Sequence, residues 1–172
     1  MQMVKQTRLD TRHRCRKFIF NNDGCDCYVN DGSMTIEGFL DARTSALIET
    51  QVDTLFYCTS KGGTGSYCHK TNVAQTFVRR DGRYAKNITP TLLEQNTDPL
   101  QVMIDWARNN SREVFWSMRM NDTHDGWGTP GDFNNDLIAP IKQQNRGWLL
   151  GGADRKPSFG LWTALDYSQP AV

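Results

Sequence analysis

Segments that read alternately as strand and helix constrain this chain most. Apolar runs occupy 17–20, 52–58 and 113–120, and helical patterns lie between them at 33–51 and 98–110. This alternation predicts parallel strands joined by right-handed helical crossovers. The consecutive apolar residues of the first run are typical of a strand that is buried on both faces. We therefore expect an α/β fold with three parallel strands in chain order.

The helix at 98–110 has the clearest sequence signal. Asp98 is a suitable N-cap, and Pro99 suits the first helical position because its missing N–H costs nothing there. Apolar side chains then recur at the helical spacing i, i+3, i+4, i+7: Leu100, Met103, Ile104 and Ala107.

The remaining segments are less regular. The stretch from Thr59 to Thr97 is expected to be a flexible loop over the top of the sheet. Its glycine-rich run 61–66 lacks the spacing of a phosphate-binding loop. Further on, we expect a short helix at 134–144, broken at Pro140, and a short fourth strand near 161–165.

The end of the sequence carries the signals of a helix start. Ser168 can cap a helix and Pro170 suits its first turn, yet only two residues come after it. Together with the parallel-strand pattern, this predicts that residues 16–172 form part of a (β/α)8 TIM barrel. That part would hold the first three to four strands and be truncated at the C-terminus. Residues 1–15 are expected to form a basic leader.

Composition sets limits on partners and compartment. The 172 residues carry a net charge of +1, so no nucleic-acid partner is expected. No apolar run is long enough to cross a membrane and no signal peptide is seen, so we expect no membrane partner and a cytoplasmic location by default. The five cysteines show no C-x-x-C spacing, which favours reduced thiols. No cofactor is expected.

Polar residues lie at or just after the ends of all three strands. Ligands of parallel sheets bind at the carboxyl ends of the strands, so these residues are the candidates for a site. Amide, carboxylate, guanidinium and imidazole groups suit sugar hydroxyls, and a histidine can also transfer a proton. The candidate sugar-binding residues are Asn22, Asp23, Tyr57, Arg119, Asn121, Asp122 and His124; Asp122 and His124 are also the candidates for catalysis.

The third strand is expected to alternate between two faces. Trp116 and Met118 would pack beneath helices, while Ser117 and Arg119 would line a polar interior. The sequence at 121–126 is also typical of a turn whose side chains bond the local backbone. Tryptophans could stack on sugar rings or act as packing anchors; these are Trp127, Trp148 and Trp162.

A metal site is the alternative interpretation of the same loop. Asp122, His124 and Asp125 offer oxygen and nitrogen ligands, but His13 and His69 would have to converge on them. The spacing does not establish this convergence, so a metal-dependent hydrolase is the weaker alternative and no metal is expected.

Three segments carry a likeness to a known group of proteins: 18–24, 52–58 and, most specifically, 113–125. Together with 148–151 and 164–168, they resemble a glycosyl-hydrolase-like barrel family of mostly uncharacterised bacterial proteins. The resemblance implies a (β/α)8 barrel and action on glycosidic bonds. It also implies that the catalytic carboxylates lie on later strands.

The resemblance implies one of two functions. The chain would contribute part of the sugar-binding cleft of a glycoside hydrolase-like enzyme, with carbohydrate as its partner and no turnover of its own. Alternatively, the barrel would bind carbohydrate without cleaving it. An uncovered sheet edge would also allow self-association.

Overall fold

The computed structural model describes residues 6, 9–61, 63–133 and 137–172. Its centre is a three-stranded sheet of order β1-β2-β5, with both strand pairs parallel. This confirms the prediction of three parallel strands in chain order. The strands are β1 (Ile19–Asn22), β2 (Thr54–Cys58) and β5 (Glu113–Ser117).

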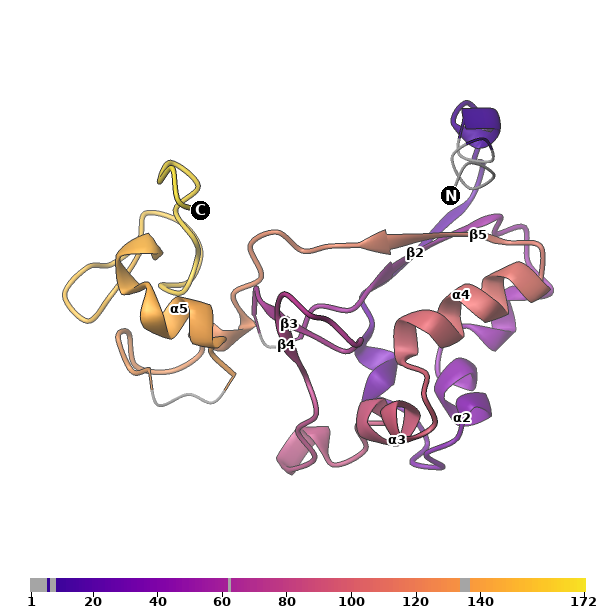
Figure 1. Cartoon of the computed structure of the whole chain (residues 1–172), viewed down its shortest axis with the longest axis horizontal. Helices are drawn as coiled ribbons and strands as arrows, with labels where there is room; N and C mark the ends of the chain where they lie inside the picture. Colours follow the sequence, from indigo (N-terminus) through magenta and orange to yellow (C-terminus); the bar gives the residue numbers. More distant parts are fainter. Residues whose placement is uncertain (1–5, 7–8, 62, 134–136) are drawn as a thin grey trace.

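Helices cover one side of this sheet (Figure 1). The helix α4 (Pro99–Asn109) begins as predicted, because the Asp98 carboxylate accepts the N–H of Gln101 at 2.9 Å. Its buried side includes Met103, which has no exposed surface. The other helices with described bounds are α2 (Ile36–Asp41), α3 (Thr89–Glu94) and α5 (Pro140–Gln144).

The predicted continuous helix at 33–51 is wrong. Met34 has a φ of 56°, a left-handed conformation that a helix cannot include, so α2 starts only after Thr35. The Thr35 hydroxyl accepts the N–H of Gly38 at 3.1 Å and acts as the N-cap. After α2, the chain forms a separate 3₁₀ turn, Ser45–Leu47.

The stretch 59–97, expected to be a flexible loop, contains ordered elements. Two short strands, β3 (Ser66–Tyr67) and β4 (Gln75–Thr76), pair in parallel. The turn Gly82–Tyr84 is a 3₁₀ helix, and α3 comes after it. Backbone hydrogen bonds join distant parts of the stretch, such as the bond from the Cys68 N–H to the Thr59 carbonyl at 2.8 Å.

The expected partial (β/α)8 barrel is also wrong. The described residues form a small α/β domain with two small parallel sheets, and neither is closed. After β5, the segment 126–131 is rich in glycine and proline, with positive φ at Gly128 and Gly131, which disfavours a strand, and this described segment forms none. The expected fourth strand near 161–165 is reduced to an isolated antiparallel bridge between Leu149 and Leu165. Of the expected helix at 134–144, residues 134–136 lie outside the described residues, and α5 begins at Pro140.

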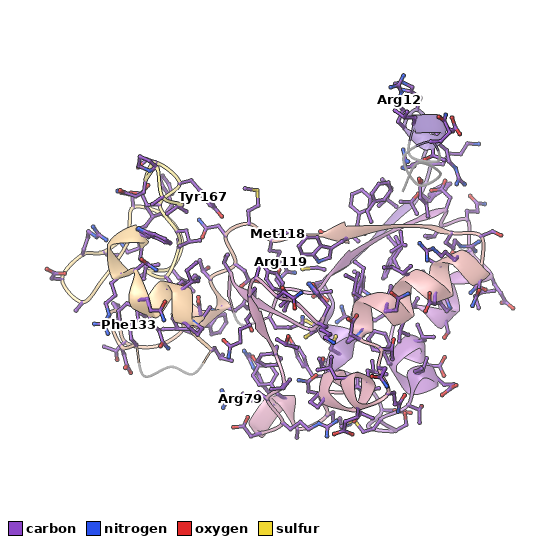
Figure 2. The ribbon with its side chains drawn as sticks, viewed as in Figure 1. Arg12, Arg79, Met118, Arg119, Phe133 and Tyr167 are labelled. Atoms are coloured by element: carbon purple, nitrogen blue, oxygen red, sulfur yellow. The ribbon has the colours of Figure 1, made fainter. Side chains whose placement is uncertain are left out.

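Two apolar clusters form the interior. The first lies between the sheet and its helices; the second lies around α5, where Phe133 packs against Trp162 at the opposite end of the molecule (Figures 1 and 2). The buried members of the first include Phe39, Leu55, Tyr57, Ile88, Leu92 and Met103, and those of the second are Ile138, Leu149 and Trp162.

The second face of the three-stranded sheet stays largely exposed among the described residues. On this face Ile19 is 49% exposed and Phe115 is 39% exposed, so the expectation of a first strand buried on both faces is wrong. Trp116 lies on the other face, in register with Tyr57, but it is 47% exposed and so is not buried beneath helices as expected. Trp116 instead donates its indole N–H to the Thr59 hydroxyl at 2.9 Å. Met118, also expected beneath helices, is 45% exposed.

All five cysteines are free thiols. Among the described helices, none has the length and apolar character that a membrane crossing requires.

Candidate functional site

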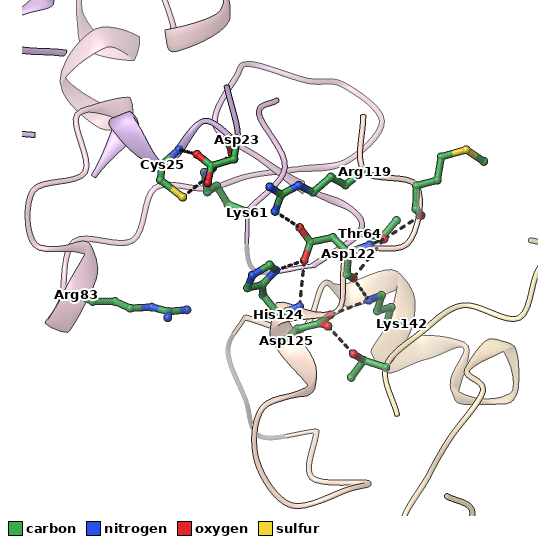
Figure 3. A network of polar contacts seen from close by, with 12 residues as sticks. Asp23, Cys25, Lys61, Thr64, Arg83, Arg119, Asp122, His124, Asp125 and Lys142 are labelled. Atoms are coloured by element: carbon green, nitrogen blue, oxygen red, sulfur yellow. Dashed lines mark hydrogen bonds and ion pairs between the residues drawn. The ribbon is translucent and has the colours of Figure 1, made fainter. Parts of the chain in front are cut away.

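Asp122 is the centre of a polar network beyond the carboxyl end of β5 (Figure 3). One of its carboxylate oxygens accepts both the backbone N–H and the ring Nδ1–H of His124, at 3.0 and 2.7 Å. Its other oxygen lies 3.5 Å from the Arg119 guanidinium. From the loop after β2, the Thr64 hydroxyl accepts the Asp122 N–H at 3.1 Å. Residue 122 is therefore held in place from three sides.

The charge state of Asp122 is set by these contacts. Burial alone would raise its pKa, but hydrogen bonds from the backbone and ring of His124, and the charges of His124 and Arg119, outweigh burial. The pKa of Asp122 is therefore lower than its ordinary value, and the carboxylate is ionised at neutral pH. An ionised carboxylate only accepts hydrogen bonds, so it fixes the proton of His124 on Nδ1 and leaves Nε2 for a ligand.

A buried ion pair supports this network from below. The Lys142 ammonium lies 2.8 Å from Asp125 Oδ2 and 3.2 Å from the Asp122 carbonyl oxygen, while the Thr163 hydroxyl donates to Asp125 Oδ1 at 2.6 Å. Burial raises the pKa of Asp125, and Lys142 and Thr163 offset part of that increase. This pair connects the His124 turn to α5 and to the C-terminal segment.

A glycine is required beside the ion pair. Gly63 has a φ of 147°, and a Cβ atom added there would lie 2.2 Å from Asp125 Oδ2. The glycine-rich run after β2 therefore allows the backbone to approach a carboxylate closely.

A cavity of about 260 Å³ opens next to His124. One wall consists of His124 and Trp127, whose rings lie nearly parallel, with centroids 6.4 Å apart and 6° between their planes. Trp127 is 71% exposed and the His124 side chain 51%. The cavity is thus flanked by flat, accessible rings and by the ring nitrogen that Asp122 leaves free.

The opposite wall comes from the 3₁₀ turn Gly82–Tyr84. The Arg83 guanidinium lies over the Tyr84 ring, 4.8 Å from its centroid, and also donates to the Tyr84 hydroxyl. Tyr84 is 4% exposed and is packed edge-to-face against Phe77 and Tyr28. The remaining residues that line the cavity are Arg79, Asp81, Gly82 and Leu137.

The predicted residues of the first two strands lie elsewhere. Asn22 is buried and forms a local turn, accepting the Gly24 N–H at 2.8 Å and donating to Asp26 at 2.8 Å. Asp23 forms an ion pair with Arg43. Tyr57 is fully buried in the core, with its hydroxyl 3.4 Å from Asp26 Oδ1. None of these three lines the cavity.

The predicted residues after the third strand divide into two groups. Arg119, Asp122 and His124 form one hydrogen-bonded group, in which His124 lines the cavity and the other two lie behind it. Asn121 instead pairs with the backbone of Leu165, accepting its N–H at 2.8 Å and donating to its carbonyl at 3.1 Å. Of the three tryptophans considered for stacking, Trp127 lines the cavity, Trp148 is half-buried and Trp162 is a core residue.

The alternative metal site has no counterpart in the described part of the chain, where no group of three or more His, Cys, Asp or Glu side chains could hold a metal ion. Asp125 is occupied by Lys142, and His69 forms a hydrogen bond with the Thr59 hydroxyl at 2.8 Å.

Arg83, Tyr84 and Lys142 belong to the site, although no sequence pattern indicated them. Arg83 and Tyr84 lie about 40 residues before His124 on a different loop, and no periodic pattern relates the two loops. Lys142 resembles an ordinary surface lysine in sequence, and only its full burial distinguishes it.

No protein-family model matches this chain, and no curated protein matches it significantly.

Proposed function

We propose that this chain binds carbohydrate in the cavity beside His124, as the sugar-binding part of a glycoside hydrolase-like protein. The observation that carries the proposal is the parallel pair of accessible rings, His124 and Trp127, on one cavity wall. An exposed indole that also lines a cavity offers a flat apolar surface for the C–H face of a sugar ring.

Polar groups beside the rings suit the hydroxyl groups of the same ligand. His124 Nε2 accepts or donates a hydrogen bond, and its orientation is fixed because Asp122 holds Nδ1 at 2.7 Å. The cavity of about 260 Å³ is slightly smaller than the usual ~300–1,000 Å³ of small-molecule sites, which favours one sugar unit.

Binding is a better-supported function than hydrolysis for the described chain. Glycoside hydrolysis needs one carboxyl to protonate the leaving oxygen and another to attack or to activate water. Asp122 is ionised and shared between His124 and Arg119, and Asp125 is buried against Lys142. Neither is available for either role.

The test is titration of the full chain with a panel of neutral oligosaccharides, measured by isothermal calorimetry. Trp127→Ala is expected to weaken binding of the best ligand at least about tenfold, since about 1.4 kcal/mol of lost stacking corresponds to that factor. The matched control is Phe159→Ala, because Phe159 is 85% exposed and does not line the cavity. Equal affinity of the two variants for that ligand would refute the proposed site.

Turnover of aryl glycosides and polysaccharides by the same full-length chain is expected to be absent. Turnover that is lost in Asp122→Asn would show that the loop after β5 is catalytic, and the binding proposal would then be incomplete.

A further inference from the structure

We infer that the sugar bound in this cavity is acidic, a hexuronate whose carboxylate is held by Arg83. This inference rests on the proposed carbohydrate site and adds the class of ligand. It is carried by the charge and geometry of the wall opposite Trp127, which the binding proposal itself does not use.

Arg83 is a cation whose N–H donors are mostly available to a ligand. Its guanidinium is exposed, donates one N–H to the Tyr84 hydroxyl, and has no carboxylate partner among residues 6, 9–61, 63–133 and 137–172. A guanidinium carries five N–H donors, so most of them remain for a ligand. Figure 3 shows the Arg83 side chain extended from its turn toward the side on which His124 lies.

The position of Arg83 is set before any ligand arrives. Its guanidinium lies over the ring of Tyr84, which is itself 4% exposed and fixed between Phe77 and Tyr28, with ring centroids 4.9 and 5.0 Å away. Stacking on a buried ring limits the conformers of a long side chain, so less entropy is lost when it binds.

The other two charged residues of this wall offset each other, so Arg83 supplies its net charge. Arg79 and Asp81 also line the cavity, and they form an ion pair with each other. Their opposite charges offset one another, so the wall carries a formal charge of +1 from Arg83. An anionic group on the ligand would complement this charge.

A carboxylate fits this arrangement better than a neutral hydroxyl. Two parallel N–H groups of a guanidinium bind the two oxygens of a planar carboxylate, and such charge-assisted bonds are about twice as strong as neutral ones. A hexuronate carries its carboxylate at the edge of a ring whose face can stack on Trp127. The two walls would therefore bind different parts of one sugar unit.

The test compares ligands that differ only in charge. Oligosaccharides of glucuronate, galacturonate and mannuronate are titrated into the full chain by isothermal calorimetry at low salt. Their methyl esters and the corresponding neutral gluco-, galacto- and manno-oligosaccharides are titrated in the same way. We expect one acidic oligosaccharide to bind at least about tenfold tighter than its methyl ester, a preference that decreases with added salt.

Arg83→Gln is expected to abolish the preference, so that the acid binds no more tightly than its methyl ester. Arg83→Lys should keep part of the preference, because the charge remains while the bidentate geometry is lost. Arg108→Gln is the matched control, because Arg108 is an exposed arginine of α4 that does not line the cavity. Circular dichroism confirms that each variant is folded.

The outcomes separate the two proposals. If neutral and acidic sugars bind equally well and binding depends on Trp127, the carbohydrate site stands and the inference of an acidic sugar is overturned. A preference for the acid that survives in Arg83→Gln, or stronger binding of a sulfated oligosaccharide than of any uronate, also overturns it. If no oligosaccharide of the panel binds, both proposals fail.

Discussion

The Lys142 ammonium lies 2.8 Å from Asp125 Oδ2, and neither side chain has any exposed surface. The two residues lie on different elements, since Asp125 belongs to the turn that carries His124 and Lys142 belongs to α5. The pair therefore positions the cavity wall relative to the second apolar cluster. A buried pair of this kind makes the local structure sensitive to the loss of either partner.

Lys142→Met is expected to lower the free energy of unfolding by about 3–5 kcal/mol, because the buried Asp125 carboxylate would lose its cationic partner. Lys156→Met, at an exposed lysine, should change it by less than about 0.5 kcal/mol. Urea unfolding of the full-length variants measures both values. If the double variant Lys142→Met/Asp125→Leu is as unstable as Lys142→Met alone, the unpaired charge is not the cause.

Gly63→Ala is expected to destabilise the same region. The added Cβ would lie 2.2 Å from Asp125 Oδ2, and alanine is strained at a φ of 147°. We expect the free energy of unfolding, measured with urea, to decrease by about 1–3 kcal/mol. Gly147→Ala is the control, because a Cβ there meets nothing within 4 Å and its φ is not in the positive range. Equal effects of the two substitutions would contradict this explanation.

Local signals predicted the central part of the fold. The order and parallel pairing of β1, β2 and β5, and the start of α4 at Asp98, arise from apolar runs and a capping residue that act over a few positions. The left-handed conformation at Met34 has no such signal, because methionine rarely adopts it, and the helix prediction at 33–51 failed there.

Local signals could not distinguish a barrel from an open sheet. Three parallel strands are compatible with both, and the difference lies in the segment after β5. That segment is irregular because it contains the glycines and the proline of 126–131. It packs around the second apolar cluster and contains the buried Lys142. The Asp122–His124 contact can be predicted from the sequence, because the two residues are only two positions apart. The position of Arg83 on the facing wall depends on the tertiary structure.

The Asp122 carboxylate should contribute stability in a pH-dependent way. Its pKa is lower in the folded chain than in the unfolded chain, where it is about 3.9. Its contribution is therefore fully present above about pH 3.9 and is lost as the pH falls through the lower, folded pKa. We expect Asp122→Asn to lower the free energy of unfolding most between about pH 5 and pH 7, and progressively less below about pH 4.

The measurement is urea unfolding of the parent chain and of Asp122→Asn at several pH values, compared as a difference. Other carboxylates with lowered pKa values, such as Asp53 and Asp166, affect both proteins equally and cancel in that difference. If the difference in the free energy of unfolding stays constant from about pH 7 to pH 3, the charge of Asp122 does not contribute and the residue acts only through neutral hydrogen bonds.

The uncovered face and edges of the three-stranded sheet are expected to cause self-association of the chain. On this face Ile19 of β1 is 49% exposed and Phe115 of β5 is 39% exposed. Each of the two outer strands also has one edge that no other strand of the described chain pairs with. An open sheet edge flanked by large apolar side chains favours pairing with a second copy.

Ile19→Lys should weaken this association, because a charge on an edge strand opposes pairing with another apolar edge. Sedimentation velocity over a wide concentration range is expected to show species larger than the monomer for the parent chain, and a shift toward the monomer for this variant. Val73→Lys is the matched control, because Val73 is 95% exposed but lies in the loop between β3 and β4, away from the sheet face. A parent chain that stays monomeric at every concentration would contradict the prediction, and an equal shift in both variants would show that added charge acts without regard to the sheet.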